Sequence, residues 1–376
     1  MVRSRSAVVV GGGIGGLAAA IGLRRIGWDV TVLERAPAFA DVGAGISLHA
    51  NGMRALDALG VGEAIRATVR PVYTGGTLTP DGRMLSRLDG AALERRLGTP
   101  VVGVLRADLH RVLREALPDG LVRTGVEVAD VGGAGGDADL VVAADGVDSR
   151  LRAELFPRHP GAVYSGSTVL RAVTERPLHD LSSDLELTWG RGAEFGHIRF
   201  VDGRSEWHAV LTAPPGVRHR DPLAAVRRRF HGWHDPIPAL LDATRPQDVL
   251  HHDIHELVTP LPTFTVGRVA LLGDAAHAMT PSLGQGAGQA LEDAAVLASC
   301  LATGPTTASA LRRYDAVRRP RSQSVARAAR RAGRMGHGLT HPVTIALRNG
   351  ALRLVPSGVV LRAALRHAAW APPRIR

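Results

Sequence analysis

The pattern of apolar and polar positions changes along the chain. Short, mainly apolar runs of strand length lie toward both ends, at residues 7–10, 30–33, 140–144 and 266–272. Such runs are typical of strands in a parallel sheet that is covered on both faces. Helical patterns lie between or after them, at residues 14–26, 105–117 and 285–301. Strand and helix therefore alternate at both ends of the chain, as they do in a Rossmann-like domain.

The middle of the chain has a different period. From about residue 161 to residue 253, apolar and polar positions alternate between turns, for example in 194–200 and 206–212 around Asp202-Gly203. This alternation predicts an antiparallel sheet. Residues 309–376 are rich in arginine and alanine and predict helices, with breaks near Pro320, Pro342 and Pro356.

These patterns predict an α/β fold: a Rossmann-like cofactor domain with an inserted antiparallel β-sheet domain and C-terminal helices. The cofactor domain is discontinuous in sequence. We expect it to comprise residues 1–70, 100–160 and 265–330, the inserted substrate domain residues 71–99 and 161–264, and the helical segment residues 331–376.

Composition excludes several classes of function. The net charge of +11 would suit an acidic partner, but the 46 basic residues are all arginine and are scattered along the chain, without a groove-reading motif. We therefore expect no nucleic-acid partner. Cys300 is the only cysteine, so an intrachain disulfide, a CxxC redox pair and a cysteine-built metal site are all impossible. No metal site is predicted.

Targeting signals are also weak. The apolar run after the basic N-terminus is too short for a signal peptide, and no apolar stretch reaches the roughly 18 residues of a membrane span. We expect a cytoplasmic protein, monomeric or homodimeric, that does not bind membranes.

A glycine-rich turn between the first strand and the first helix is the first chemical motif. Gly11-Gly12-Gly13-Ile14-Gly15-Gly16 satisfies G-x-G-x-x-G, which lets backbone amides approach a pyrophosphate at a helix N-terminus. Glu34 ends the second predicted strand, where a carboxylate can accept hydrogen bonds from an adenosine ribose. This motif predicts a dinucleotide site but does not separate FAD from NAD.

Two further motifs follow predicted strands. In LVVAADGVDSR, residues 140–150, a strand ends in Asp145-Gly146. In residues 267–293, a strand ends in Gly273-Asp274, and the glycine-rich segment 281–288 opens a helix. An aspartate at a strand end, followed by free helix N-terminal amides, suits a ribityl hydroxyl and the negative charge of a reduced flavin.

These three motifs, in this order, closely resemble those of the class A flavoprotein monooxygenases, the para-hydroxybenzoate hydroxylase-like family. Within it, residues 6–330 or so resemble the branch of salicylate hydroxylase and FAD-dependent urate hydroxylase. The resemblance implies an enzyme that binds FAD, is reduced by NAD(P)H and uses O2. It implies hydroxylation or epoxidation of a small aromatic or heteroaromatic substrate through a flavin C4a-hydroperoxide.

The resemblance also assigns site residues. The residues expected to bind FAD are Gly11, Gly13, Ile14, Gly15, Gly16, Glu34, Arg35, Gly45, Ser47, Arg106, Val128, Asp145, Gly146, Asp274, Gly284, Gln285, Gly286, Ala287 and Gly288. Asp145-Gly146 is also expected to meet NAD(P)H, and the segment 43–47 to lie along the flavin ring. Pro281, Gly284 and Gly286 are expected over the reactive face of the flavin.

Histidines are the remaining candidates. His197 and His208 lie on the predicted antiparallel sheet that should cover the substrate, and both are candidate substrate contacts. Trp207 shares one face of its strand with Ala209, and His208 shares the other with Val210, but the pattern leaves open which face is inward. His277 is expected to pack under the flavin loop, and His251, His252 and His255 are expected at the surface.

The sequence also departs from the family pattern. The usual Pro-Asn near the substrate is Ala50-Asn51, and no tyrosine stands where phenol hydroxylases use one to activate substrate. A halogenase would need a lysine, which this chain lacks, and a disulfide oxidoreductase would need a CxxC pair and a second dinucleotide motif. A flavoprotein oxidase or dehydrogenase and a non-catalytic FAD-binding protein remain as alternatives.

Overall fold

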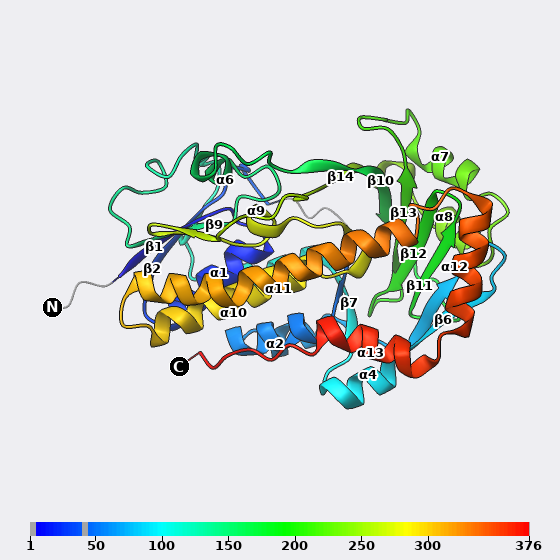
Figure 1. Cartoon of the computed structure of the whole chain (residues 1–376), viewed down its shortest axis with the longest axis horizontal. Coiled ribbons are helices and arrows are strands. Elements are labelled where there is room, and N and C mark those ends of the chain that lie inside the picture. Colours follow the sequence, from blue (N-terminus) through cyan, green and yellow to red (C-terminus); the bar gives the residue numbers. More distant parts are fainter. Residues whose placement is uncertain (1–4, 40–43, 376) are drawn as a thin grey trace.

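The computed structural model describes residues 5–39 and 44–375. Figure 1 shows two β-sheet regions side by side, with the long helix α11 (Thr307–Met335) running from one to the other. The expected α/β fold, with a Rossmann-like sheet, a separate sheet and C-terminal helices, is confirmed. The exact domain limits remain a prediction.

The first region is a six-stranded sheet built from both ends of the chain. In spatial order its strands are β15 (Thr265–Val266), β16 (Val269–Leu271), β9 (Leu140–Ala143), β1 (Ser6–Val10), β2 (Asp29–Leu33) and β8 (Val122–Arg123). All neighbouring pairs are parallel except β15 with β16. The carboxyl ends of β1, β2, β9 and β16 therefore meet at one edge, where ligands bind in such sheets.

Small side chains let two helices pack closely against each other beside this sheet. Helix α1 (Ile14–Arg25) lies against α10 (Gly286–Thr303). A Cβ atom on Gly22 would stand 2.9 Å from the Cβ of Ala298, which is closer than side chains approach. The glycines and alanines of α1 thus set the spacing of the two helices that carry the first and third motifs.

The expected helix break near Pro320 is wrong, because α11 continues through it. Proline removes one backbone hydrogen bond and usually bends or ends a helix. Here Arg318 and Arg321, on either side of Pro320, bind the buried carboxylates of α10 and hold the helix in place. Pro342 instead starts α12 (Pro342–Leu354), and Pro356 caps α13 (Ser357–Ala368).

The second region is a seven-stranded sheet from the middle of the chain. In spatial order its strands are β14 (Leu250–Glu256), β10 (Val163–Val173), β13 (Ser205–Thr212), β12 (Ala193–Arg199), β11 (Leu185–Gly190), β5 (Thr74–Leu78) and β6 (Met84–Asp89). The antiparallel sheet expected for residues 161–253 is confirmed, and β5, from an earlier part of the chain, joins it by pairing in parallel with β11. These two strands are far apart in sequence, so no hairpin forces them to be antiparallel.

Two faces of this sheet have different partners. Phe195, Trp207 and Ala209 pack with Phe230 and Leu240 in a core beneath α7 (Pro222–Arg229) and α8 (Ile237–Asp242). The opposite face, which carries Glu206 and His208, turns toward the cofactor region.

A three-stranded sheet joins the two regions. It consists of β3 (Gly45–Leu48), β7 (Val101–Leu105) and β4 (Arg70–Val72). A Cβ on Gly45 would lie 2.5 Å from the Cβ of Glu206, so β3 runs directly against the seven-stranded sheet. The remaining helices are α2 (Ala50–Leu59), α3 (Gly62–Arg66), α4 (Gly90–Leu97), α5 (Arg106–Glu115), α6 (Arg150–Leu155) and α9 (Asp274–His277).

Candidate functional site

The glycine loop after β1 has the geometry of a phosphate site. Gly11 has a φ of +107°, and a Cβ there would lie 2.2 Å from the carbonyl oxygen of Ala144. A Cβ on Gly16 would lie 1.9 Å from the carbonyl oxygen of Gly11. By contrast, a Cβ on Gly13 would meet nothing within 4 Å, so the amides before α1 open onto free space. Larger side chains are thus excluded where the turn is tight, and the open side has room for a ligand.

Glu34 stands at the end of β2 beside this loop. Its carboxylate accepts hydrogen bonds from the amides of Gly12 at 2.6 Å and Ala36 at 2.9 Å. The same carboxylate lines a cavity of about 410 Å³ together with Gly12 and Gly13. The acid is therefore held in place by the backbone while its remaining lone pairs can accept ribose hydroxyls.

The opposite wall of this cavity is positively charged. Arg106, at the start of α5, and Arg171, on β10, both line it. Burial and the neighbouring charge of Arg171 lower the pKa of Arg106, while Asp274 raises it. The Nε atom of Arg171 is buried without a hydrogen-bond partner in the described residues. Two guanidinium groups in one cavity fit an anionic occupant such as the pyrophosphate of FAD.

The other expected adenosine contacts lie nearby. Val126 donates to the carbonyl of Glu34 at 2.9 Å, so the segment that carries the buried Val128 runs along the end of β2. Arg35 is exposed next to Glu34. Ile14 and Gly15 begin α1, where a Cβ on Gly15 would meet Leu272 at 2.6 Å. Direct contacts of these residues with the cofactor remain a prediction.

The carboxylate of Asp145 already has hydrogen-bond partners within the protein. It accepts hydrogen bonds from the Ser149 hydroxyl at 2.6 Å and the Leu151 amide at 3.2 Å, and so caps α6. Gly146 follows with a φ of +85°. Arg152 donates to the carbonyls of Val147 at 2.6 Å and Ala275 at 3.1 Å, which ties this turn to the third motif. The expected contacts of Asp145-Gly146 with FAD and NAD(P)H stay a prediction.

Asp274 is exposed at the carboxyl end of β16. Gly273 and His277, on either side of it, both bond the buried carboxylate of Asp293. Gly273, with a φ of +61°, donates its amide to Asp293 at 3.0 Å. His277, only 2% exposed, bonds the same carboxylate oxygen through Nε2 at 2.6 Å. His277 therefore packs beneath the turn, as expected, while the contact of Asp274 with a ribityl hydroxyl remains a prediction.

The turn before α10 brings two predicted flavin segments together. Pro281–Leu283 forms a 3-10 turn, and Gly284 follows with a φ of +60°. A Cβ on Gly284 would lie 2.4 Å from the Ser47 hydroxyl oxygen. Residues 284–288 then lead into α10, and their amides point out of its N-terminus. Ser47 is thus beside Gly284 in space, whereas Gly43 lies outside the described residues.

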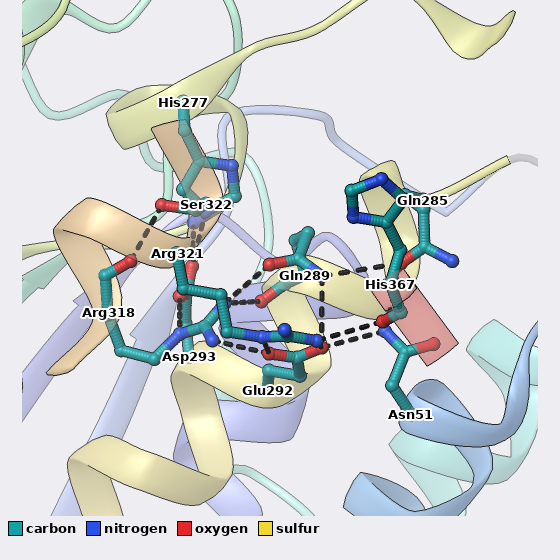
Figure 2. A network of polar contacts seen from close by, with 11 residues as sticks. Asn51, His277, Gln285, Gln289, Glu292, Asp293, Arg318, Arg321, Ser322 and His367 are labelled. Carbon is teal, nitrogen blue, oxygen red and sulfur yellow. Dashed lines mark hydrogen bonds and ion pairs between the residues drawn. The ribbon is translucent and has the colours of Figure 1, made fainter. Parts of the chain in front are cut away.

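A buried polar network supports this arrangement, and sequence reasoning missed it. Figure 2 shows residues of α2, α10 and α11 converging on two acids of α10, Glu292 and Asp293. Arg318 donates from Nε to Asp293 at 2.6 Å and also bonds Glu292. Arg321 donates to Glu292 at 2.7 Å, and Asn51 does so at the same distance. All of these except Arg321 are fully buried.

This network also reaches the start of α10. The Asn51 amide donates to the Gln285 side chain at 2.9 Å, and Gln289 donates to Glu292 at the same distance. The signal available in the sequence was the pair of acids Glu292-Asp293 inside an otherwise apolar helix, which required buried partners. The network thus holds Gln285 at the start of α10, next to the expected flavin site.

The two candidate histidines of the sheet lie on opposite faces. His208 pairs with Arg171 on β10 and faces the cofactor region. His197 pairs with Trp207, so its side chain lies on the face that packs against α7 and α8. The expectation that His197 contacts substrate is corrected accordingly, because alternate residues of a strand point to opposite faces. Burial lowers the pKa of His197 to about 4.

Comparison with known proteins decides which family this site belongs to. Residues 5–329 match the family described as an FAD binding domain. The chain belongs to this family. The resemblance to class A flavin monooxygenases that the motifs indicate is thereby confirmed, and the cavity and its two arginines fit FAD.

Three relatives illustrate the match. The chain is 38% identical to the aurachin C monooxygenase/isomerase of Stigmatella aurantiaca, over 89% of this chain and 91% of that protein. It is 34% identical to the 6-hydroxynicotinate 3-monooxygenase of Pseudomonas fluorescens, over 80% and 83%. The crystal structure of Klebsiella pneumoniae HpxO complexed with FAD and uric acid superposes with a TM-score of 0.88 at 28% identity, over 97% and 96%.

Other kinds of site are not found in residues 5–39 and 44–375. No group of three His, Cys, Asp or Glu side chains in these ranges could hold a metal ion, and His251, His252 and His255 form no such cluster. No helix in the same ranges is long and apolar enough to cross a membrane.

Replacing Asp274 should weaken FAD binding, whereas replacing His277 should lower the stability of the protein. Asp274→Asn is expected to weaken FAD binding by about 1.5–3 kcal/mol, because it removes a charged acceptor from a buried hydroxyl. The melting temperature of the apo-protein should not change, since Asp274 is exposed there. His277→Ala should lower that melting temperature, because it leaves Asp293 short of a partner. FAD titrations and thermal melts of both apo-variants test this, and equal losses of FAD affinity would contradict it.

Proposed function

We propose that this protein is an FAD-dependent monooxygenase that uses NAD(P)H and O2 to hydroxylate or epoxidise a small aromatic or heteroaromatic substrate. One observation carries the proposal beyond the family match. The strand Gly45–Leu48 and the turn Pro281–Leu283 meet at Ser47 and Gly284, between the cofactor cavity and the covering sheet. Both segments carry small side chains where they meet, and a flat ring would lie against them.

The residues of this chain would hold the cofactor from end to end. Glu34 would accept the ribose hydroxyls, and the amides near Gly13 would bind the pyrophosphate at the positive end of α1. Arg106 and Arg171 would neutralise the phosphates, and Asp274 would accept a hydrogen bond from the ribityl chain. Bound FAD would supply the chemistry, taking two electrons from NAD(P)H and transferring one oxygen atom of O2 to the substrate.

The protein's part in the reaction is electrostatic and steric. The free amides at the start of α10, near Gly286 and Ala287, would stabilise negative charge on the reduced ring. Pro281 and Gly284 would shape the space above its reactive face. His208, on the covering sheet, would contact the substrate, and the sheet would keep water from the reacting atoms.

The proposal can be tested by following the reduction of the flavin. No second dinucleotide motif accompanies the first, so NAD(P)H should bind only transiently near Asp145-Gly146. Anaerobic stopped-flow mixing should show slow reduction by NAD(P)H alone and much faster reduction once a true substrate is bound. Equal rates with and without substrate would contradict the expected control of flavin reduction by substrate. A reduced protein that meets oxygen and only releases hydrogen peroxide with every substrate would favour an oxidase instead.

A further inference from the structure

Two buried carboxylates and an imidazole lie on the cofactor-facing side of the seven-stranded sheet. In the register of β12 and β13, Gly196 stands opposite His208 and Ile198 opposite Glu206. Glu194 is two residues before Gly196 and shares its face. The contact between Gly45 and Glu206 fixes this face toward β3. The three polar side chains therefore look toward the expected flavin ring.

The histidine lies between the two acids. His208 Nδ1 is 3.3 Å from Glu206 Oε2, and its Nε2 is 3.8 Å from Glu194 Oε1. Glu194 also accepts a hydrogen bond from the Trp189 indole at 2.6 Å. A Cβ on Gly196 would come within 2.4 Å of His208 Nε2, so the missing side chain makes room for the imidazole.

The cluster is open on the histidine side and carries negative charge. The side chains of Glu194 and Glu206 are 7% and 5% exposed, whereas that of His208 is 27% exposed, although its strand is central in the sheet. Burial acts to lower the pKa of His208, but the charges of Glu206 and Glu194 outweigh it and raise that pKa. Two carboxylates therefore stand beside a single imidazole, and Arg171, opposite it on β10, acts against this rise in pKa.

A second histidine, His337 in the turn that follows α11, lies beside this cluster. His337 is 7% exposed, and its Nδ1 has no hydrogen-bond partner in the described residues. A Cβ on Gly333 would lie 3.1 Å from the His337 ring and 2.7 Å from the Ser282 hydroxyl, which places His337 beside the turn above the flavin. Burial lowers its pKa, which favours the neutral imidazole, and Nδ1 is placed to bind a ligand.

Arg171 stands opposite His208 on this face, and two other arginines nearby bond backbone carbonyls. Arg171 also lines the cofactor cavity with Gly12 and Gly13. Arg348 donates to the carbonyls of Met335 and Gly336, and Arg199 donates to the carbonyl of Leu181. With Arg171 committed to the phosphates of FAD, a carboxylate on the substrate would meet two fixed acids whose charge no other arginine on this face balances.

We infer that Glu194, His208, Glu206 and His337 select an uncharged, hydroxylated N-heteroaromatic substrate that donates N–H or O–H hydrogen bonds, and that they reject aryl carboxylates. The inference rests on the proposed function, because it places the substrate between this cluster and the flavin. Carboxylates accept hydrogen bonds from such donors, and like charges brought together without water repel strongly.

Two matched pairs of compounds test this selectivity with the FAD-loaded protein. The first pair is 6-hydroxynicotinamide and 6-hydroxynicotinate, and the second is 4-hydroxyquinoline-2-carboxamide and its carboxylate. Within each pair the compounds differ by one charge and hardly in shape. Changes in the flavin absorption spectrum report binding, and at least one amide is expected to bind roughly tenfold or more tightly than its carboxylate.

Variants identify the residues responsible. Glu206→Gln and Glu194→Gln each remove one charge and should narrow the difference between amide and carboxylate by at least about threefold. Glu186→Gln is the matched control, because Glu186 pairs with His197 and lies on the opposite face of the same sheet. It should leave the preference unchanged. Thermal melts and bound FAD confirm that each variant is folded.

Three results would overturn the inference. These are tighter binding of the carboxylates, an unchanged preference in both glutamine variants, and no spectral response to any of the four compounds. None of these results would contradict the proposed function. That function is tested separately, by reduction of bound FAD with NAD(P)H and by oxygen transfer. Loss of those reactions, with the preference for the amides intact, would contradict the proposed function and not the selectivity of this cluster.

Discussion

Replacing Arg318 by methionine is expected to lower the free energy of unfolding by about 3–5 kcal/mol. Arg318 is fully buried and bonds Asp293, Glu292 and the side chain of Gln289. Removing one partner from a buried ionic network leaves charges that neither water nor protein compensates. Urea unfolding of the apo-variant measures the loss.

The neighbouring arginine provides the control. Arg319 pairs with Asp315 on the same helix, and its side chain is 32% exposed. Arg319→Met should therefore cost no more than about 0.5 kcal/mol. If the two variants lose similar stability, the network of Figure 2 does not hold α11 against α10.

A carboxylate introduced at Gly13 should abolish cofactor binding without unfolding the protein. Gly13 has a φ of −73°, which any residue adopts, and a Cβ there meets nothing within 4 Å. The side chain of Gly13→Glu would project into the expected pyrophosphate site. Repulsion of several kcal/mol should raise the FAD dissociation constant by roughly a hundredfold or more.

Two controls separate charge from size and from general effects. Gly13→Ser adds a small neutral side chain and should weaken FAD binding much less than Gly13→Glu does. Gly136→Glu adds the same charge at an exposed loop position with free space around it, and should bind FAD normally. Unchanged FAD affinity in Gly13→Glu would mean that the pyrophosphate does not lie at this loop.

The parts of the fold that depend on local patterns could be predicted from the sequence. The glycine loop, the strand ending at Glu34 and the helix after residue 285 all carry short-range signals, because turns and helix starts require particular backbone angles. Gly11 and Gly284 show the reason directly, since both have positive φ angles and close neighbours.

Features that depend on contacts between distant residues were missed or left open. Helix α11 passes through Pro320 because Arg318 and Arg321 bind acids on another helix, and no local pattern reveals such partners. The parallel pairing of β5 with β11 joins strands from separate parts of the chain. The alternation in β13 separated His208 from Trp207, but the positions of α7 and α8 were needed to decide which face is inward.

The most direct test of the account is oxygen transfer with labelled gas. The FAD-loaded protein would be incubated with NAD(P)H, ¹⁸O₂ and a panel of hydroxylated N-heteroaromatics, phenols and purines, and the products analysed by mass spectrometry. The account predicts a product that carries one ¹⁸O atom from O2, formed in step with NAD(P)H oxidation. Consumption of NAD(P)H that yields only hydrogen peroxide, with no labelled product from any compound, would contradict it.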